Sequence, residues 1–251
     1  MTRLEQIARQ ARLDILEMSL CAKAGHVPSA LSMVDYMTVV FGRLKLGLDR
    51  ILLGKPFGAQ AYYALLAGYG VIERDWGRYG TSQPGWTYIM DRDHPLVHYI
   101  DDTMGNALGV ACGVAQGCEA RVYVNMSDAA LQAGTTWEAF AYAGWRQLDN
   151  IVVTIDHNDM QVLGKISEIC PIEPLETKLC AFGWRVLRSD GHNMGAIEDA
   201  VEQAFDPCAR PTIVVFDTIK GKGVPFMEGA PGWHYRKLDS QTYAEAIRCL
   251  Q

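Results

Sequence analysis

Apolar residues near the start of the chain recur at the spacing of an α-helix. They return every three or four positions, as Leu4, Ile7, Ala8, Ala11, Ile15 and Met18. A turn is predicted at residues 24–29, where the sequence reads AGHVPS. A second helix is expected to run from Met33 to Phe41, with Ser32 as its N-cap. The beginning of the chain is therefore predicted to be helical.

The later part of the chain alternates between short apolar runs and helical patterns. Strands are predicted at residues 121–126, 151–155, 184–187 and 212–216. Helices are predicted at residues 104–117, 135–147 and around 195–205. The run IVVTI at 151–155 is β-branched and uncharged, which is typical of a strand buried on both faces. Strands and helices in this order predict an α/β fold with a parallel sheet flanked by helices.

Composition favours one unit over several. The chain has 251 residues, of which 49% are hydrophobic, enough for one large core or two small ones. No repeat or Pro/Gly/Ser-rich linker divides it, so a single domain over residues 1–251 is expected. Its seven cysteines are odd in number and lack C-x-x-C spacing. Buried free thiols are expected, rather than a disulfide framework.

The charge pattern argues against two classes of partner. A formal net charge of -6 lacks the basic footprint of a nucleic-acid-binding protein. There is also no Lys/Arg run suited to an anionic membrane surface. The N-terminus, MTRLEQIARQARLD, has no apolar signal-peptide core, and no apolar run is long enough to span a bilayer. A cytoplasmic protein that binds neither nucleic acid nor membrane is expected.

Two polar residues follow predicted strands in a way that suggests a binding site. Asp128 comes after the strand at 121–126, and Asn158 comes after the strand at 151–155. Ligands of open parallel sheets bind beyond the carboxyl ends of the strands, so both residues are expected to face one crevice. Carboxylate and amide oxygens suit Mg²⁺ or Ca²⁺, with a phosphate completing the coordination. The alternative is that each side chain only caps a loop or a helix.

Other polar motifs are weaker. His94 and His98 have the spacing H-x-x-x-H, but Pro95 argues against a helix across them and no third zinc ligand is evident. The sequence KGKG at 220–223 lacks the spacing of a phosphate-binding loop and is expected to be a flexible loop near the site. His157, beside Asn158, is expected to point to the other face of the sheet.

Five segments resemble transketolases, in the same order along the chain. They are KAGHVPSALSMVDYM, DTMGNALGVACGVAQG, SDAALQAGTTWEAFAYAGWRQLDNIVVTIDHNDMQVLG, DGHNMGAIEDAV and TIKGKGVPFMEGAPGWHYRKL. The third resembles the family's thiamine diphosphate motif, in which Gly-Asp-Gly is followed by a later Asn. The resemblance covers nearly the whole chain. It implies the diphosphate-binding (PP-type) domain fold, with thiamine diphosphate and Mg²⁺ or Ca²⁺ as cofactors.

The resemblance assigns the cofactor contacts residue by residue. Asp128, Asn158 and the backbone carbonyl of Met160 match the family's metal ligands. Ala129 stands in the diphosphate motif. Met104 and Gly105 match the segment that contacts the aminopyrimidine of the cofactor.

Three further residues match catalytic positions of the family. His26 matches a histidine of the substrate channel, His234 matches a histidine near the thiazolium, and Glu138 matches an acid at the subunit interface. Either histidine is expected to act as an acid or a base near neutral pH. The alternative for each is a loop histidine that bonds to the backbone.

Three residues depart from the family pattern. Ala129 replaces the second glycine of Gly-Asp-Gly, which adds a Cβ, disfavours a positive φ and is expected to weaken cofactor binding. Ala133 replaces an acid of the interface proton network. Phe57 replaces a histidine of the segment Ser-Lys-Gly-His, and it can neither donate a hydrogen bond nor carry charge. Phe57 and Ala133 therefore favour an unusual donor or acceptor.

A complete transketolase continues into a pyrimidine-binding domain and a third domain, whereas this sequence is similar to the first domain. The resemblance therefore implies a C-terminal transketolase-like partner subunit, and activity only in complex with it. An α2β2 heterotetramer is expected from closed two-fold symmetry.

The expected reaction is transfer of a two-carbon ketol unit from a ketose or ketose phosphate to an acceptor, with the cofactor supplying the carbanion chemistry. The alternative is a non-catalytic or weakened scaffold subunit descended from such an enzyme. The residues do not identify the donor, the acceptor or the pathway.

Overall fold

A six-stranded sheet forms the centre of the computed structural model, which describes residues 1–83, 85–90 and 96–251. The strands are β1 (Arg50–Gly54), β2 (Tyr99–Ile100), β3 (Val122–Ser127), β4 (Ile151–His157), β5 (Arg185–Asp190) and β6 (Thr212–Asp217). They lie in the order β2-β1-β3-β4-β6-β5, and every neighbouring pair is parallel. The predicted parallel α/β sheet is confirmed.

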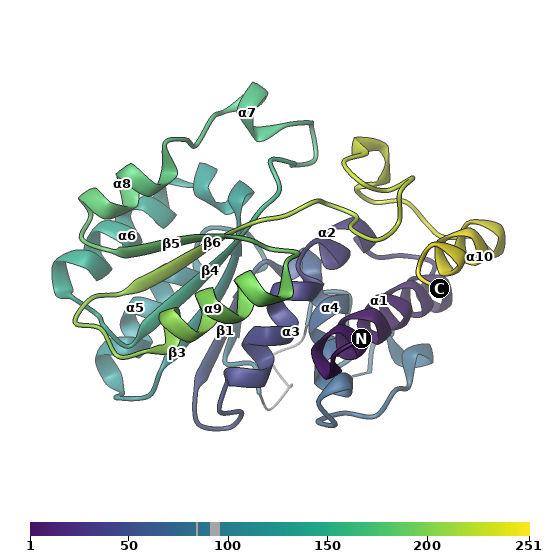
Figure 1. Ribbon diagram of the computed structural model, residues 1–251, viewed down its shortest axis with the longest axis horizontal. Coiled ribbons are helices and arrows are strands. Elements are labelled where there is room, and N and C mark those ends of the chain that lie inside the picture. The colour runs from purple at the N-terminus through teal and green to yellow at the C-terminus, as the bar shows by residue number, and fades with distance from the viewer. Residues whose placement is uncertain (84, 91–95) are drawn as a thin grey trace.

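Helices cover both faces of this sheet (Figure 1). They are α1 (Arg3–Ala22), α2 (Val27–Ser32), α3 (Val34–Arg43), α4 (Ala59–Gly68), α5 (Ala107–Gly117), α6 (Gly134–Arg146), α7 (Ile166–Ile169), α8 (Leu175–Ala181), α9 (Met194–Phe205) and α10 (Ser240–Cys249). Buried residues of α1, α3, α4 and α9 form one core, and those of α5, α6 and α8 form the other. The sheet therefore lies between two helical layers.

Strand β4 shows why the run at 151–155 is mostly apolar and carries no charge. Val152 packs into the first core, while Ile151, Val153 and Ile155 pack into the second. Successive side chains of a strand point to opposite faces, so a strand covered on both sides needs apolar residues at every position.

The region after the first helix differs from its prediction. Residues 27–29, expected to end a turn, instead begin the short helix α2, because Pro28 in its first turn is compatible with helical geometry. Ser32 ends this helix and caps none. Its hydroxyl donates instead to the buried carboxylate of Asp156, at 2.7 Å. The expected N-cap is therefore wrong.

Three elements between residues 50 and 100 were not predicted from the sequence. Strands β1 and β2 are short, and β2 has only two residues. Helix α4 has the sequence AQAYYALLAG and is buried from Ala59 to Ala67. A helix that is apolar all round carries no amphipathic period, so its pattern could not be distinguished from that of a buried strand.

All seven cysteines are free, but the expectation that they are buried is wrong for most of them. Cys112 is buried, whereas Cys21, Cys170, Cys180 and Cys249 are exposed. Among the residues that the structure describes, no helix is both long enough and apolar enough to cross a membrane.

Gly144 of helix α6 lies tightly against the backbone of a neighbouring segment. A Cβ on Gly144 would lie 1.8 Å from the backbone carbonyl oxygen of Phe182. Gly144→Ala is therefore expected to lower the free energy of unfolding by about 3 kcal/mol, because the backbone must move to make room. Urea denaturation measures the change.

Gly113→Ala on α5 is the matched control, since a Cβ there meets nothing within 4 Å. It should leave stability unchanged or raise it by up to about 1 kcal/mol, because alanine favours the helix. Equal stability of the two variants would contradict the close approach at Gly144.

Candidate active site

The carboxyl ends of four neighbouring strands meet at one cavity. This cavity has a volume of about 520 Å³. Lys55 follows β1, Asp128 follows β3, Asn158 follows β4, and Lys220 lies shortly after β6. Because β1, β3, β4 and β6 are parallel neighbours, they bring these four side chains to the same edge of the sheet.

Asp128 is a buried carboxylate at this edge, with only 1% of its surface exposed. Its Oδ1 accepts from the backbone N–H of Ala129 at 2.8 Å. Its Oδ2 accepts from the N–H groups of Asn158 and Asp159, at 2.8 and 2.7 Å. The predicted meeting of Asp128 and Asn158 in one crevice is confirmed. Burial, followed by the nearby Asp156 carboxylate, raises the pKa of Asp128 to about 6, because both disfavour its ionised form.

Asn158 and Met160 add two more oxygens. The Asn158 Oδ1 accepts from the N–H of Met160 at 3.1 Å, and its Nδ2 donates to Ser32 and Asp156. The carbonyl oxygen of Met160 accepts from the Lys220 ammonium at 3.2 Å. A carboxylate, an amide oxygen and a carbonyl oxygen form a donor set that fits Mg²⁺ or Ca²⁺. A dication bound to the Met160 carbonyl would take the place of that ammonium.

No group of three His, Cys, Asp or Glu side chains suited to a metal occurs in the described part of the chain. A metal at this edge would therefore depend on the Asn158 amide and a backbone carbonyl as well as on Asp128. The roles of Asp128, Asn158 and Met160 as ligands stay predictions.

A buried ion pair beside Asp128 was not found from the sequence. The Lys55 ammonium pairs with the Asp156 carboxylate and donates to the carbonyl oxygen of Ser29 at 2.8 Å. Burial by itself would raise the pKa of Asp156, but Lys55 and the hydroxyls of Thr218 and Ser32 hold it below its ordinary value. A charged residue at the end of the apolar run IVVTI was the available signal for Asp156.

Lys220 also belongs to the cavity. Its side chain is buried, and its Nζ lies 3.2 Å from the Met160 carbonyl oxygen and 3.0 Å from His234 Nδ1. Burial, and then Lys55, lowers the pKa of Lys220 to about 8. The segment at 220–223 is a loop near the cavity, as expected, and hydrogen bonds from the Ile219 and Gly221 N–H groups hold it on both sides of Lys220.

Aromatic rings form one wall of the cavity. The ring centroid of His26 lies 4.6 Å from Phe57, 5.3 Å from His234 and 4.7 Å from Tyr235. Burial lowers the pKa of both histidines to about 4, assisted by His234 and Lys220 at His26, and by Lys220 and Lys55 at His234. Both rings are therefore neutral at neutral pH, which suits hydrogen bonding better than the acid–base role expected of an unperturbed histidine.

Met104 reaches the cavity, whereas Gly105 and Glu138 do not line it. Gly105 has a φ of +115°, and its N–H donates to the Asp101 carboxylate, which also accepts from the first N–H groups of α5. Gly105 and the exposed Glu138 line a separate groove of about 640 Å³ between α5 and α6. Glu138 therefore does not share the cavity of Asp128 and Asn158, and its place at the subunit interface stays a prediction.

Ala129 lines the cavity without the expected backbone strain. It lies in a 3₁₀ turn from Asp128 to Gln132 and is not among the described non-glycine residues with a positive φ. Only the added Cβ distinguishes it from the family's glycine.

The remaining histidines lie elsewhere. His94 and Pro95 are outside the described residues, and His98 accepts a hydrogen bond from the N–H of Ile51 at 3.1 Å. His157 lies 2.9 Å from the Asp217 carboxylate and is not among the residues that line the cavity.

Two family models match the chain. The model described as the thiamine diphosphate binding domain of transketolase matches residues 114–249. The model of 1-deoxy-D-xylulose-5-phosphate synthase matches residues 1–172.

Similar curated proteins include components of two transketolases. The 6-deoxy-6-sulfo-D-fructose transketolase subunit of a Clostridium species is 35% identical over 90% of this chain and 88% of its own length. An apulose-4-phosphate transketolase subunit of Actinobacillus succinogenes is 30% identical over 93% of this chain and 90% of its own length.

Solved transketolases share the fold. The transketolase of Campylobacter jejuni superimposes on the whole chain with a TM-score of 0.91 at 22% identity. The Leishmania mexicana transketolase does so with a TM-score of 0.89 at 21% identity. This chain spans 43% and 41% of those two proteins.

Proposed function

The chain belongs to the transketolase family, and from this we propose that it is the cofactor-binding subunit of a two-carbon ketol transferase. In this proposal it binds thiamine diphosphate and Mg²⁺ or Ca²⁺ at the cavity, and a partner subunit completes the site. The cofactor, when bound, supplies the carbanion chemistry, and the protein supplies binding, orientation and electrostatics.

One observation carries the proposal. The cavity combines three oxygen donors, from Asp128, Asn158 and Met160, with the ammonium groups of Lys55 and Lys220. Oxygen donors suit a hard dication, and ammonium groups suit the oxygens of a diphosphate. A metal–diphosphate group needs both kinds of contact in one place.

The other lining residues receive roles from this arrangement. His26 and His234 lie on the aromatic wall, where neutral imidazoles can donate to or accept from the hydroxyl and carbonyl groups of a sugar. Met104 reaches the cavity from the turn before α5, and with Gly105 we assign it to the aminopyrimidine side. Glu138 is assigned to the interface with the partner, on the groove between α5 and α6.

The donor is proposed to be a ketose or a ketose phosphate. The names of the two relatives, a sulfofructose transketolase subunit and an apulose-4-phosphate transketolase subunit, support a donor or acceptor outside the ordinary sugar phosphates. Phe57 supports the same proposal, because it places an apolar ring 4.6 Å from the His26 ring, where the family pattern has a histidine.

A C-terminal transketolase-like subunit is the proposed partner. Relatives named as subunits match this chain along nearly their whole length, whereas the solved transketolases are much longer than the part it matches. Closed two-fold symmetry then favours two copies of each subunit, an α2β2 heterotetramer. The cytoplasmic location stays a prediction.

Thiamine diphosphate titration tests the proposal directly. The chain is combined with the product of a neighbouring reading frame that encodes a pyrimidine-binding domain, and binding is followed by circular dichroism with and without Mg²⁺. A screen of ketose donors with mass spectrometry of the released aldehyde then identifies the substrate. Absence of cofactor binding by the assembled complex would refute the proposal.

Replacing Phe57 by histidine tests the specificity argument. If loss of the family's histidine excludes ordinary ketose phosphates, Phe57→His should raise their kcat/KM by roughly tenfold, the effect of one recovered hydrogen bond to a polar substrate group. Phe57→Leu is the control, since it keeps an apolar side chain and should leave the substrate profile unchanged. If the two folded variants share one profile, Phe57 only fills space.

A second candidate is a non-catalytic or weakened scaffold subunit. The triplet Ser127-Asp128-Ala129 and the loss of an acid at Ala133 favour it, because they alter the diphosphate motif and the interface network. It predicts that the chain assembles with its partner. It also predicts that substitutions of Asp128 do not change the affinity of the complex for the cofactor. The enzyme proposal predicts the opposite result.

A further inference from the structure

We propose that His192, oriented by Asp35, is a positioning residue that holds the loop of residues 218–223 so that Lys220 reaches the cavity. The loop's importance for cofactor binding rests on the function proposed above. The positioning itself is a property of this chain's own residues.

The two ring nitrogens of His192 make different hydrogen bonds. Its Nε2 accepts from the backbone N–H of Ile219 at 2.8 Å. Because Nε2 accepts, the ring proton lies on Nδ1, which donates to the Asp35 carboxylate at 2.8 Å. Asp35 therefore selects the tautomer that can hold the residue before Lys220, as carboxylates do for histidines that bind metals.

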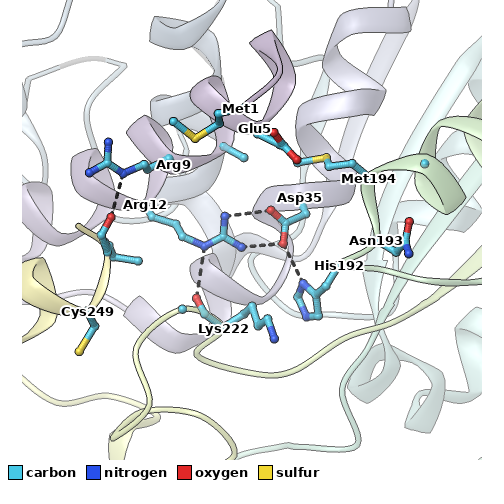
Figure 2. Close-up of a pocket in the computed structure, with 14 residues that line it drawn as sticks. Met1, Glu5, Arg9, Arg12, Asp35, His192, Asn193, Met194, Lys222 and Cys249 are labelled. Atoms are coloured by element: carbon cyan, nitrogen blue, oxygen red, sulfur yellow. Dashed lines mark hydrogen bonds and ion pairs between the residues drawn. The ribbon is translucent and has the colours of Figure 1, made fainter.

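Arg12 holds the other end of the loop (Figure 2). Its guanidinium is bidentate on Asp35, at 2.9 and 2.6 Å, and its Nε donates to the carbonyl oxygen of Lys222 at 3.3 Å. Asp35 thus connects a contact at Ile219 with a contact at Lys222. Lys220 lies between these two fixed points.

The loop is also fixed from the direction of the cavity. The N–H of Gly221 donates to the carbonyl oxygen of Pro28 at 2.9 Å, in the helix that follows His26. Gly221 has a φ of +88°, and a Cβ there would lie 2.5 Å from the carbonyl oxygen of Met227. From this fixed backbone the Lys220 side chain extends towards Met160 and His234.

The surroundings of His192 distinguish positioning from simple packing. Arg12, Asp35 and His192 border an open hollow of about 790 Å³ (Figure 2). Replacement of His192 removes two hydrogen bonds at the border of this hollow. The side chains of His192 and Asp35 are nevertheless only 10% exposed, so water replaces these bonds poorly.

The experiment compares three variants of the full chain. His192→Leu removes the acceptor for the Ile219 N–H. His192→Gln can place its amide oxygen near the position of Nε2, so it restores an acceptor for the Ile219 N–H. His98→Leu removes a comparable acceptor of a backbone N–H, at Ile51, away from the cavity.

Limiting acetic anhydride acetylates accessible lysines, and mass spectrometry measures the rate at Lys220. This rate reports whether the buried Lys220 amine has become accessible. The rate should rise several-fold in His192→Leu and stay at the wild-type level in His192→Gln and His98→Leu. In the complex with its partner, His192→Leu should weaken thiamine diphosphate binding by roughly tenfold, the usual effect of losing an outer orienting partner.

A nitrogen-15 NMR spectrum of wild-type His192 should show the tautomer with the proton on Nδ1. A proton on Nε2 would overturn the inference. An unchanged Lys220 acetylation rate in His192→Leu would also overturn it, as would an increased rate in His192→Leu that His192→Gln shares. If acetylation follows the expected order but the wild-type complex binds no thiamine diphosphate, the positioning stands and the proposed function fails.

Discussion

Asp128→Ala is expected to abolish metal-dependent thiamine diphosphate binding. The variant removes the one charged oxygen ligand proposed for a buried dication, and loss of a buried charge partner costs about 3–5 kcal/mol, a decrease in affinity of more than about 100-fold. Isothermal titration with Mg²⁺, on the chain assembled with its partner, measures the change.

Two further variants separate charge from fold. Asp128→Asn keeps an oxygen that can accept from the Asn158 and Asp159 N–H groups, so it should fold normally and still lose most of the affinity. Asn158→Ala removes a neutral ligand and should weaken binding more mildly, by about 2 kcal/mol.

Asp149→Ala is the matched control, because Asp149 is exposed and lies just before β4, at the opposite edge of the sheet. It should bind as the wild type does. Wild-type affinity in both Asp128 variants would disprove the site assignment.

The isolated chain is expected to turn over no ketose at all. In the proposed enzyme the pyrimidine half of the cofactor site belongs to the partner subunit, so one half without the other cannot orient the cofactor. Obligate interfaces of this kind commonly bury more than about 2,000 Å². Mixing the two subunits should therefore restore activity, and light scattering should show a heterotetramer.

The Asp128→Ala chain provides the control for assembly. Because Asp128 lies inside the cavity, this variant should still form the heterotetramer with its partner but remain inactive. Ketol transfer by the purified chain at the rate of the mixture would refute the requirement for a partner.

The parallel sheet was readable from the sequence for a local reason. Runs such as IVVTI at 151–155 and TIVVF at 212–216 carry no charge and are rich in β-branched residues, which is typical of a strand covered on both faces. The same logic predicted that Asp128 and Asn158 meet, because consecutive parallel strands end at one edge of the sheet. Neither inference needed the order of the other strands.

Glu138 shows what this reasoning does not decide. It lies on a helix that follows the Asp128 turn, and the family pattern places it at the subunit interface. Its side chain faces outward on α6, and the groove that it lines is separated from the cavity by the turn at Gly105. Proximity along the chain does not determine which side of a helical layer a residue faces.

The sequence by itself determined the α/β class, the family and the pair Asp128 and Asn158, because each depends on short-range patterns or on consecutive strands. The tertiary structure decided that Lys55 and Lys220 lie beside this pair. Their strands, β1 and β6, are placed next to β3 and β4 by crossover connections, which no local sequence pattern specifies. It also decided that Arg12, Asp35 and His192 meet behind the Lys220 loop. Such contacts join segments that are distant in the sequence. Their charges interact strongly because they are buried, whereas water would screen them in the unfolded chain.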